Sequence, residues 1–304
     1  MSNSLWLITD GKPGHLAQLR GLGERLSARA RMSPCWINAQ AHPLPWWRGL
    51  RAGKVSLPQE APTLIVGAGR TTHRLLLALS RYHGVPAVVL MRPSLPLALF
   101  DAAIIPAHDR PPKREHILIT EGVLNDVQPL ARLTPEPSGL ILVGGPSRHY
   151  LWQEQALRDQ ILTIANEAPD WQWHVTDSRR TPGSFLKALS GPAPPNLHLH
   201  SRADTPTGWV RERLAESRCT WVTPDSTSMV FEALTAGVPT GLLSLPERKK
   251  GRITGAMNRL IDTGRVTAWP SLPATDSRQT ELWEADRAAR WLMDRFPQQL
   301  RSRS

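Results

Sequence analysis

The stretch Leu5–His15, LWLITDGKPGH, decides the fold of this chain. Its apolar start, Leu5–Ile8, predicts a buried strand, and the Gly-containing turn that follows leads into a helical pattern over residues 16–31. The same order returns at Gly139–Val143, where an apolar strand is followed by a Gly-Gly loop and a helix over residues 152–168. The repeated order of strand, glycine loop and helix predicts two similar α/β halves.

Further short apolar runs alternate with helical stretches in both halves. They lie at residues 63–66, 86–90 and 102–105 in the first half and at 172–176, 198–201, 220–223 and 240–243 in the second. Strands that are apolar along their whole length are typical of a parallel sheet covered by helices on both faces. We therefore expect an α/β protein of two Rossmann-like domains facing across a cleft. The expected domains are residues 1–135 and 136–304, and the final helix could pack back on the first domain.

Composition and charge narrow the function classes. The 304 residues include 37 Lys or Arg and 26 Asp or Glu, so the formal net charge is +11. The excess of arginine reflects either an Arg-rich proteome or ligands that carry phosphates or carboxylates. No pattern of a nucleic-acid-binding module occurs, and Cys35 and Cys219 lie outside any CxxC pattern. With no signal-peptide pattern and no bilayer-spanning apolar run, we expect a cytoplasmic protein without a nucleic-acid partner, peripheral at most on the inner membrane.

The turn after the first strand would lie where open α/β sheets bind their ligands. Asp10 and His15 are the candidate catalytic residues, because a transfer reaction needs a base for the acceptor hydroxyl. Alternatively, both side chains only cap the following helix. Residues expected on the acceptor or phosphate side, from this turn and from the similar turn after residues 63–66, are Gly11, Lys12, Gly14, Gln18 and Arg70.

The second half holds the candidate donor-binding residues. Two glycines after a strand can turn main-chain N–H groups toward a pyrophosphate, and a Ser-Arg-Arg-Thr loop suits a nucleotide phosphate. Hydroxyls at a helix start can also bind phosphate, and Glu232 on that helix is placed to accept from ribose hydroxyls. The structural alternatives are an exposed polar loop and a capped helix with a surface carboxylate. The candidates are Gly144, Gly145, Ser147, Ser178, Arg179, Arg180, Thr181, Asp225, Ser226, Thr227, Ser228, Met229 and Glu232.

No metal-ligand spacing and no Asp-x-Asp pattern occur, and histidines such as His73 and His198 are scattered. We predict that no metal and no cofactor take part, the nucleotide sugar being a substrate. Arginines and helix termini would then stabilise the charge of the leaving group.

These motifs resemble a family that includes the plant mitochondrial fission factor of the ELM type and bacterial lipooligosaccharide outer-core glycosyltransferases. The similar segments cover nearly the whole chain and are Trp6–Gln18, Gly67–Thr71, Gly144–Tyr150, Ser178–Pro182 and Asp225–Pro239. The resemblance implies a GT-B-like fold, with a nucleotide-sugar donor in the interdomain cleft and held mainly by the second half. Thr227 stands where the family often has a different small residue.

Three segments bear on the acceptor. The segment Pro45-Trp46-Trp47-Arg48, near Arg51 and Lys54, places two indoles beside positive charge, and Leu95–Phe100 is a second apolar candidate for a membrane surface. Both could instead be packed core segments. The run Lys249-Lys250-Gly251-Arg252 would meet an anionic acceptor or the donor phosphates, or simply be solvated.

The expected function is that of a metal-independent, inverting glycosyltransferase. It would move a sugar from a nucleotide-sugar donor to a lipid-linked saccharide acceptor such as lipooligosaccharide core, with Asp10 or His15 as base. Retention of configuration remains an alternative. A nucleotide-sugar epimerase of the same fold would turn over free donor, and a non-catalytic membrane-associated scaffold would bind donor without turnover.

Overall fold

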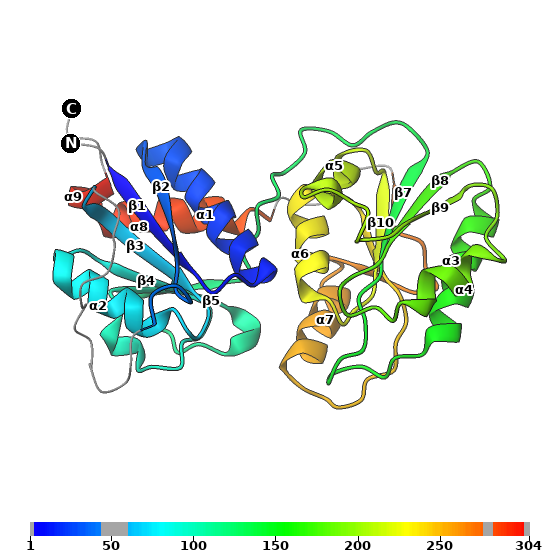
Figure 1. Cartoon of the computed structure of the whole chain (residues 1–304). Coiled ribbons are helices and arrows are strands. Elements are labelled where there is room, and N and C mark those ends of the chain that lie inside the picture. The colour runs from blue at the N-terminus through cyan, green and yellow to red at the C-terminus, as the bar shows by residue number, and fades with distance from the viewer. Residues whose placement is uncertain (1–2, 44–59, 276–281, 301–304) are drawn as a thin grey trace. The chain divides into compact units, whose positions relative to one another are not determined.

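The computed structural model describes residues 3–43, 60–275 and 282–300, and the chain divides into two compact units (Figure 1). The first unit is Met1–Asp126 with Trp283–Ser304, and the second is Val127–Leu282. The boundary therefore precedes the expected one at residue 135. A main-chain bond explains the difference, because Leu130 N donates to Ala236 O within the second unit. The last helices belong to the first unit.

The first unit is built on a six-stranded parallel sheet in the order β2-β1-β3-β4-β5-β6. The four inner strands are buried almost throughout, which explains why they are apolar along their whole length. The strands are β1 (Ser4–Thr9), β2 (Ser33–Asn38), β3 (Pro62–Ala68), β4 (Ala87–Leu90), β5 (Ala102–Pro106) and β6 (Ile117–Thr120).

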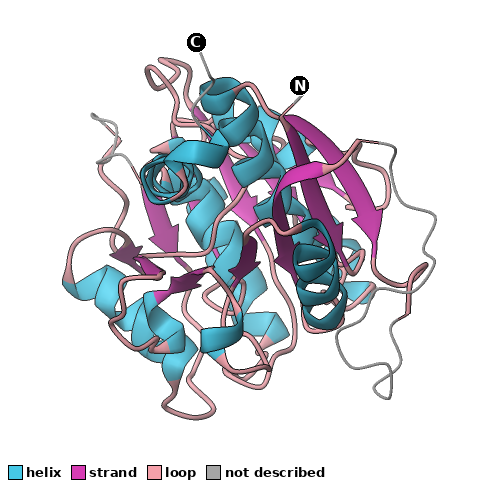
Figure 2. Ribbon diagram, turned by 90° about the vertical axis from the view of Figure 1, so that its left-hand side faces the viewer, coloured by secondary structure: helices cyan, strands magenta, loops and turns pink. Residues whose placement is uncertain are grey.

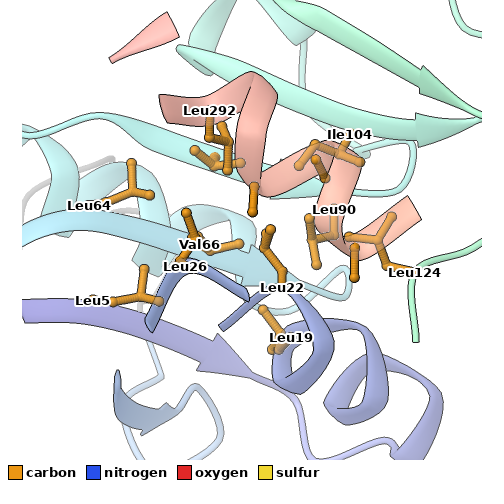
Figure 3. Close-up of a cluster of buried hydrophobic side chains, with 14 of the residues drawn as sticks. Leu5, Leu19, Leu22, Leu26, Leu64, Val66, Leu90, Ile104, Leu124 and Leu292 are labelled. Atoms are coloured by element: carbon orange, nitrogen blue, oxygen red, sulfur yellow. The ribbon is translucent and has the colours of Figure 1, made fainter. Parts of the chain in front are cut away.

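Helices cover both faces of this sheet. On one face, α1 and α8 pack their leucines and alanines against β1, β3, β4 and β5, and Figure 3 shows Leu22, Leu26 and Leu292 among the side chains of this cluster. On the other face, α2 packs its leucines against Trp6 and Ile65. The helices are α1 (Pro13–Ala30), α2 (His73–His83), α8 (Glu284–Arg295) and α9 (Pro297–Leu300), with short 3-10 turns η2 (Leu97–Leu99) and η3 (Ala107–Asp109).

The second unit repeats the plan with a six-stranded parallel sheet in the order β12-β11-β10-β7-β8-β9. Figure 2 shows the strands of the protein flanked by helices and joined by loops. The strands are β7 (Ser138–Leu142), β8 (Gln172–Thr176), β9 (Leu197–His200), β10 (Cys219–Val222), β11 (Thr240–Leu242) and β12 (Thr267–Ala268). The helices are α3 (Glu154–Glu167), α4 (Ser184–Ser190), α5 (Trp209–Ala215), α6 (Thr227–Ala236) and α7 (Arg252–Asp262).

Two glycines in this second sheet make room for buried tryptophans on the neighbouring strand. Gly139 lies opposite Trp173 and Gly241 opposite Trp221 in the strand register. A Cβ atom would come within 2.2 Å of the Trp173 ring at Gly139 and within 2.4 Å of the Trp221 ring at Gly241. Each glycine thus lets an indole lie flat across its strand.

Of the two segments considered for a membrane surface, the structure describes only the second. Residues 45–48, 51 and 54 lie outside the described residues. In the second segment Phe100 is buried, and Leu95 and Leu97 pack against the core on the α2 face, while Leu99 is 38% exposed. Within the described residues, no helix combines the length and apolar character that crossing a bilayer requires. The Leu95–Phe100 segment therefore packs one side against the core and leaves Pro96, Ala98 and Leu99 exposed.

Gly21 and Gly255 offer a matched pair of substitutions inside helices. A Cβ at Gly21 in α1 would lie 1.9 Å from the main-chain oxygen of Asn125, whereas at Gly255 in α7 nothing lies within 4 Å. We expect Gly21→Ala to lower the free energy of unfolding by about 1–3 kcal/mol, because main-chain atoms must move. Gly255→Ala should raise it by about 0.5–1 kcal/mol through helix propensity. Urea denaturation measures both, and equal effects would contradict the close contact at Gly21.

Candidate active site

Asp10 and His15 form a hydrogen-bonded pair at the carboxyl end of β1. His15 Nδ1 lies 2.8 Å from Asp10 Oδ1, and the side chain of Asp10 is almost fully buried. The turn between them is folded by its own polar groups, since Gly11 N donates to Thr9 Oγ1 and Lys12 N donates to Asp10 Oδ1. Gly11 adopts a φ of +78°, which a glycine tolerates without strain. The sequence-predicted base candidates are thus brought into direct contact.

The charge of Asp10 determines how the histidine can act. Burial raises the pKa of Asp10, but the hydrogen bonds from His15 and from Lys12 N, with their charges, outweigh it and hold the pKa below its ordinary value. An ionised carboxylate only accepts hydrogen bonds, so Nδ1 of His15 carries the proton of the shared bond. In the neutral form of the ring, Nε2 of His15 then presents a lone pair. Asp10 orients the imidazole, and His15 is the group able to take a proton.

The backbone of Gly69, after β3, packs against this pair. Gly69 has a φ of +101°, and a Cβ there would lie 2.5 Å from Asp10 Oδ2 and 2.7 Å from His15 Nδ1. Asp10 Oδ2 is buried and has no hydrogen-bond partner among the described residues, although Lys12 Nζ lies 3.6 Å away. The glycine in the Gly67–Thr71 motif is therefore required by the close approach of two loops.

His73 lies near this pair, although no sequence pattern had selected it as a site residue. It is buried as the first residue of α2, and its Nδ1 accepts a bond from Ser94 N at 3.4 Å and lies 3.1 Å from Ser94 Oγ. Burial lowers the pKa of His73 to about 4, and the nearby charges of Arg70 and His15 act in the same direction. His73 is therefore neutral at physiological pH.

The remaining candidates of the first unit lie around the same sheet edge. Lys12, Gly14 and Arg70 are exposed. Gln18 is buried one turn into α1, and its Nε2 lies 3.3 Å from the sulfur of Met91, which follows β4. Met91 and His73 could have been found by asking which residues follow the carboxyl ends of β3 and β4, where ligands of such sheets bind.

In the second unit, three loops are locked together around Gly144 and Gly145. Ser178 Oγ and Thr181 Oγ1 both donate to Gly144 O, and Arg180 Nη1 donates to Gly145 O. Arg180 Nη2 also lies 2.8 Å from the buried carboxylate of Asp225. The loops after β7, β8 and β10 are thereby held as one rigid group of side chains.

These contacts change the expected role of Gly144 and Gly145. Gly144 N donates to Thr223 Oγ1 at 2.7 Å and Gly145 N donates to Asp225 Oδ2 at 3.0 Å, so both N–H groups are satisfied within the protein. They do not face a ligand as the sequence pattern suggested. The anion that Gly145 N binds is the carboxylate of Asp225, which packs so closely against Gly144 that a Cβ there would lie 2.4 Å from it. In this loop, the sequence-predicted site residues begin at Asp225 and leave out Thr223, which ends the predicted strand at 220–223.

The start of α6 is open in the sense that, among the described residues, its N-cap side chain forms no bond to it. Ser226 is the N-cap but makes no side-chain capping bond, so the first N–H groups of α6 have no side-chain acceptor from it. Ser228 is exposed and Glu232, four residues further on the same helix face, is half-buried. Arg179 is exposed in the neighbouring loop. A helix start with hydroxyls and a nearby arginine can receive a phosphate.

The remaining donor-site candidates are Ser147, Thr227 and Met229. Ser147 Oγ accepts bonds from His149 N and Tyr150 N, and so shapes its own loop. Thr227 and Met229 are half-buried in the first turn of α6. Among the described residues, no group of His, Cys, Asp and Glu side chains is arranged to hold a metal ion.

Comparisons with known proteins show which family and which solved structures this chain is similar to. The model of the family described as Mitochondrial fission ELM1 matches residues 13–296. No curated protein matches this sequence. A UDP-GlcNAc 2-epimerase from Neisseria meningitidis bound to UDP-GlcNAc is similar in structure, with a TM-score of 0.54, 12% identity and coverage of 97% of this chain and 92% of that one.

Glycosyltransferases have similar structures as well. The glycotransferase of kitacinnamycin gives a TM-score of 0.53 at 13% identity, covering 98% of this chain and 95% of that one. MurG from Acinetobacter baumannii gives 0.50 at 15% identity, covering 98% and 92%. These likenesses show the fold alone, which is two six-stranded parallel sheets with flanking helices as in GT-B proteins. The expected fold class is confirmed in this respect.

Proposed function

The chain belongs to the mitochondrial fission ELM1 family, and on this basis we propose that it is a glycosyltransferase using a nucleotide-sugar donor. The acceptor is a lipid-linked glycan such as lipooligosaccharide core, reached at the cytoplasmic face of the inner membrane. The reaction is metal-independent and inverts the anomeric carbon. The observation that carries the proposal is the Asp10–His15 pair, because an ionised, buried carboxylate beside a histidine prepares a base for an acceptor hydroxyl.

In the proposed step, His15 Nε2 removes the proton of the acceptor hydroxyl while that oxygen forms a bond to the anomeric carbon. The bond from the anomeric carbon to the diphosphate oxygen breaks, and its electron pair stays on the diphosphate. Asp10 stabilises the imidazolium that forms and keeps its ring in place. The neutral His73 and the exposed Arg70 and Lys12 surround the acceptor at the same edge.

The donor is held by the second unit. The open start of α6, with Ser226, Thr227 and Ser228, accepts the diphosphate, and Arg179 adds a charged fork. Glu232, on the Ser228 face of α6, accepts from the ribose hydroxyls. Ser178, Arg180, Thr181 and Asp225 hold the Gly144–Gly145 loop rigid beside them.

Calorimetry with nucleoside diphosphates tests the donor site. We expect Glu232→Ala to weaken binding of the preferred nucleoside diphosphate by about 10-fold or more, the usual effect of losing a bond to a charged group. Glu167→Ala, at the carboxyl end of α3, removes an exposed carboxylate from another helix and should leave affinity unchanged. Equal affinity in wild type and Glu232→Ala would end the ribose assignment.

A nucleotide-sugar epimerase is the second candidate, favoured by the similarity to the Neisseria meningitidis epimerase. Incubating the protein with a nucleotide sugar alone separates the two functions. An epimerase would change the configuration of the free sugar nucleotide, whereas a transferase consumes it only when an acceptor is present. A scaffold would bind the donor and change it under neither condition.

A further inference from the structure

Two loops at the carboxyl edge of the second sheet are hydrogen-bonded to each other. Leu151 N donates to Pro246 O at 2.8 Å, Arg248 N donates to His149 O at 2.9 Å, and Tyr150 forms an antiparallel bridge with Glu247. We call residues 148–151 and 246–252 together the basic ribbon. It is a built structure, since Tyr150 at its centre is only 4% exposed.

The place of the basic ribbon follows from the strand order. Its two loops leave β7 and β11, and β10 lies between these strands in the sheet. The chain continues from β10 through Asp225 into the open start of α6. Tyr150 is close enough to Asp225 for its pKa to be raised, first by burial and then by the charges of Glu247 and Asp225. The ribbon therefore joins the loops on either side of the proposed diphosphate site.

The charge of the ribbon is strongly positive. Its exposed charged side chains are Arg148, Arg248, Lys249, Lys250 and Arg252. The only acidic residue in the ribbon, Glu247, accepts a bond from Asn258 at 2.8 Å. The buried carboxylate of Asp225, whose charge acts on Tyr150, is already paired with Arg180. In the described part of the chain, Arg248, Lys249 and Lys250 form no ion pair.

The charges of both loops of the ribbon act on the pKa of His149. Burial lowers the pKa of His149, and the positive charges of Arg148 and Arg252 lower it further. The side chains of the two loops thus act on one point, although they are about 100 residues apart in sequence. Like charges held together by main-chain bonds repel one another, and an anion between them would relieve that repulsion.

We propose that the basic ribbon binds the diphosphate of the nucleotide donor and neutralises it as the leaving group. This rests on the proposed transferase function and adds Arg248, Lys249 and Lys250 to the donor site. When the bond to the anomeric carbon breaks, the electron pair stays on the diphosphate oxygen, and fixed cations stabilise that charge. Main-chain bonds hold the ribbon in position before the donor arrives, so little reorganisation is needed.

The test compares two triple variants of the full-length protein by calorimetry. Arg248→Ala with Lys249→Ala and Lys250→Ala removes three charges from the ribbon. Arg81→Ala with Lys113→Ala and Arg114→Ala removes three exposed charges from the first unit and serves as the matched control. The titrants are UDP, CDP, ADP and GDP, with inorganic pyrophosphate as a probe that needs no base recognition.

We expect the ribbon variant to bind the preferred nucleoside diphosphate and pyrophosphate about 10- to 100-fold more weakly, which is the range for one or two charge-assisted bonds. The control should bind as wild type does, and the salt dependence of affinity should be flatter in the ribbon variant only. Binding of pyrophosphate should also raise the pKa of His149, followed by NMR, in wild type but not in the ribbon variant.

Other results would overturn the proposal. Equal affinity of the ribbon variant and wild type would show that the ribbon is not part of the donor site, while the transferase function would stand. An equal loss in both triple variants would show an effect of net charge alone. Loss of binding to phosphatidylglycerol vesicles with unchanged diphosphate affinity would identify a membrane contact instead. Failure of wild type to bind any of the five titrants would reject both the ribbon site and the proposed function.

Discussion

Replacing His15 by alanine is expected to lower the rate of sugar transfer by about 10²- to 10⁴-fold, the usual contribution of a general base. The acceptor hydroxyl would then have to lose its proton to water. Donor affinity should not change, because the proposed donor residues belong to the second unit. A radiolabelled transfer assay gives the rate, and calorimetry gives the affinity.

Asp10→Asn tests the orienting role of the carboxylate. An amide can donate to Nδ1 of His15 and so favour the tautomer with the proton on Nε2, which could no longer act as a base. The loss should therefore approach that of His15→Ala. His116→Ala, just before β6 and hence at the opposite edge of the sheet, is the control and should transfer normally. If both His15→Ala and Asp10→Asn kept full activity, the base would have to be sought elsewhere.

Replacing Asp286 by alanine should produce the largest loss of stability. Its buried carboxylate binds Arg25 Nε at 2.8 Å and both Arg29 Nε at 2.6 Å and Nη2 at 2.7 Å, with Arg290 Nε at 3.2 Å. Without the carboxylate, Arg25, whose side chain is only 17% exposed, keeps its charge without a partner, so we expect a loss of about 3 kcal/mol in the free energy of unfolding. Urea denaturation provides the measurement.

The control is Asp170→Ala, which removes an exposed carboxylate and should change the free energy of unfolding by less than about 0.5 kcal/mol.

The dependence of stability on pH gives a second test of the Asp286 ion pairs. Burial raises the pKa of Asp286, but hydrogen bonds from Arg29 and Arg25 outweigh it and lower the pKa below its ordinary value. A lowered pKa stabilises the fold above the unfolded value of about 3.9 and ceases to do so as the pH falls through the folded value. The gap between wild type and Asp286→Ala should therefore narrow in acid, and a constant gap would contradict the ion-pair argument.

Much of the fold was predictable because its signals are local. Apolar runs followed by glycine loops, as at Leu5–His15 and Gly139–Val143, predict buried parallel strands wherever they occur. Which of the two sheets α8 packs against was not predictable in this way. Its buried alanines and Leu292 predict a helix with an apolar face, but such a face fits either sheet. The choice depends on partners such as Arg29, which is 257 residues away from Asp286.

The candidate site likewise has some features that follow from local sequence and others that depend on the tertiary structure. The sequence motif selected Asp10 and His15 as separate base candidates, and their contact follows from a turn only five residues long. The role of His73 depends on β3 lying next to β1, which only the sheet order supplies. The satisfied N–H groups of Gly144 and Gly145 depend on Thr223 and Asp225, about 80 residues later. Whether a glycine loop is open to a ligand or closed by the protein is therefore a property of the tertiary structure.

The return of Trp283–Ser304 to the first unit has a consequence for synthesis on the ribosome. Domains usually fold in the order in which they emerge, at about 5–20 residues per second. Here the second unit is contiguous and can complete itself as it leaves the exit tunnel. The first unit cannot be completed until α8 has been synthesised, so the sheet face that α8 covers stays exposed in the meantime. The first part to be made is thus the last to be finished, and during that interval it is the part that chaperones would have to protect.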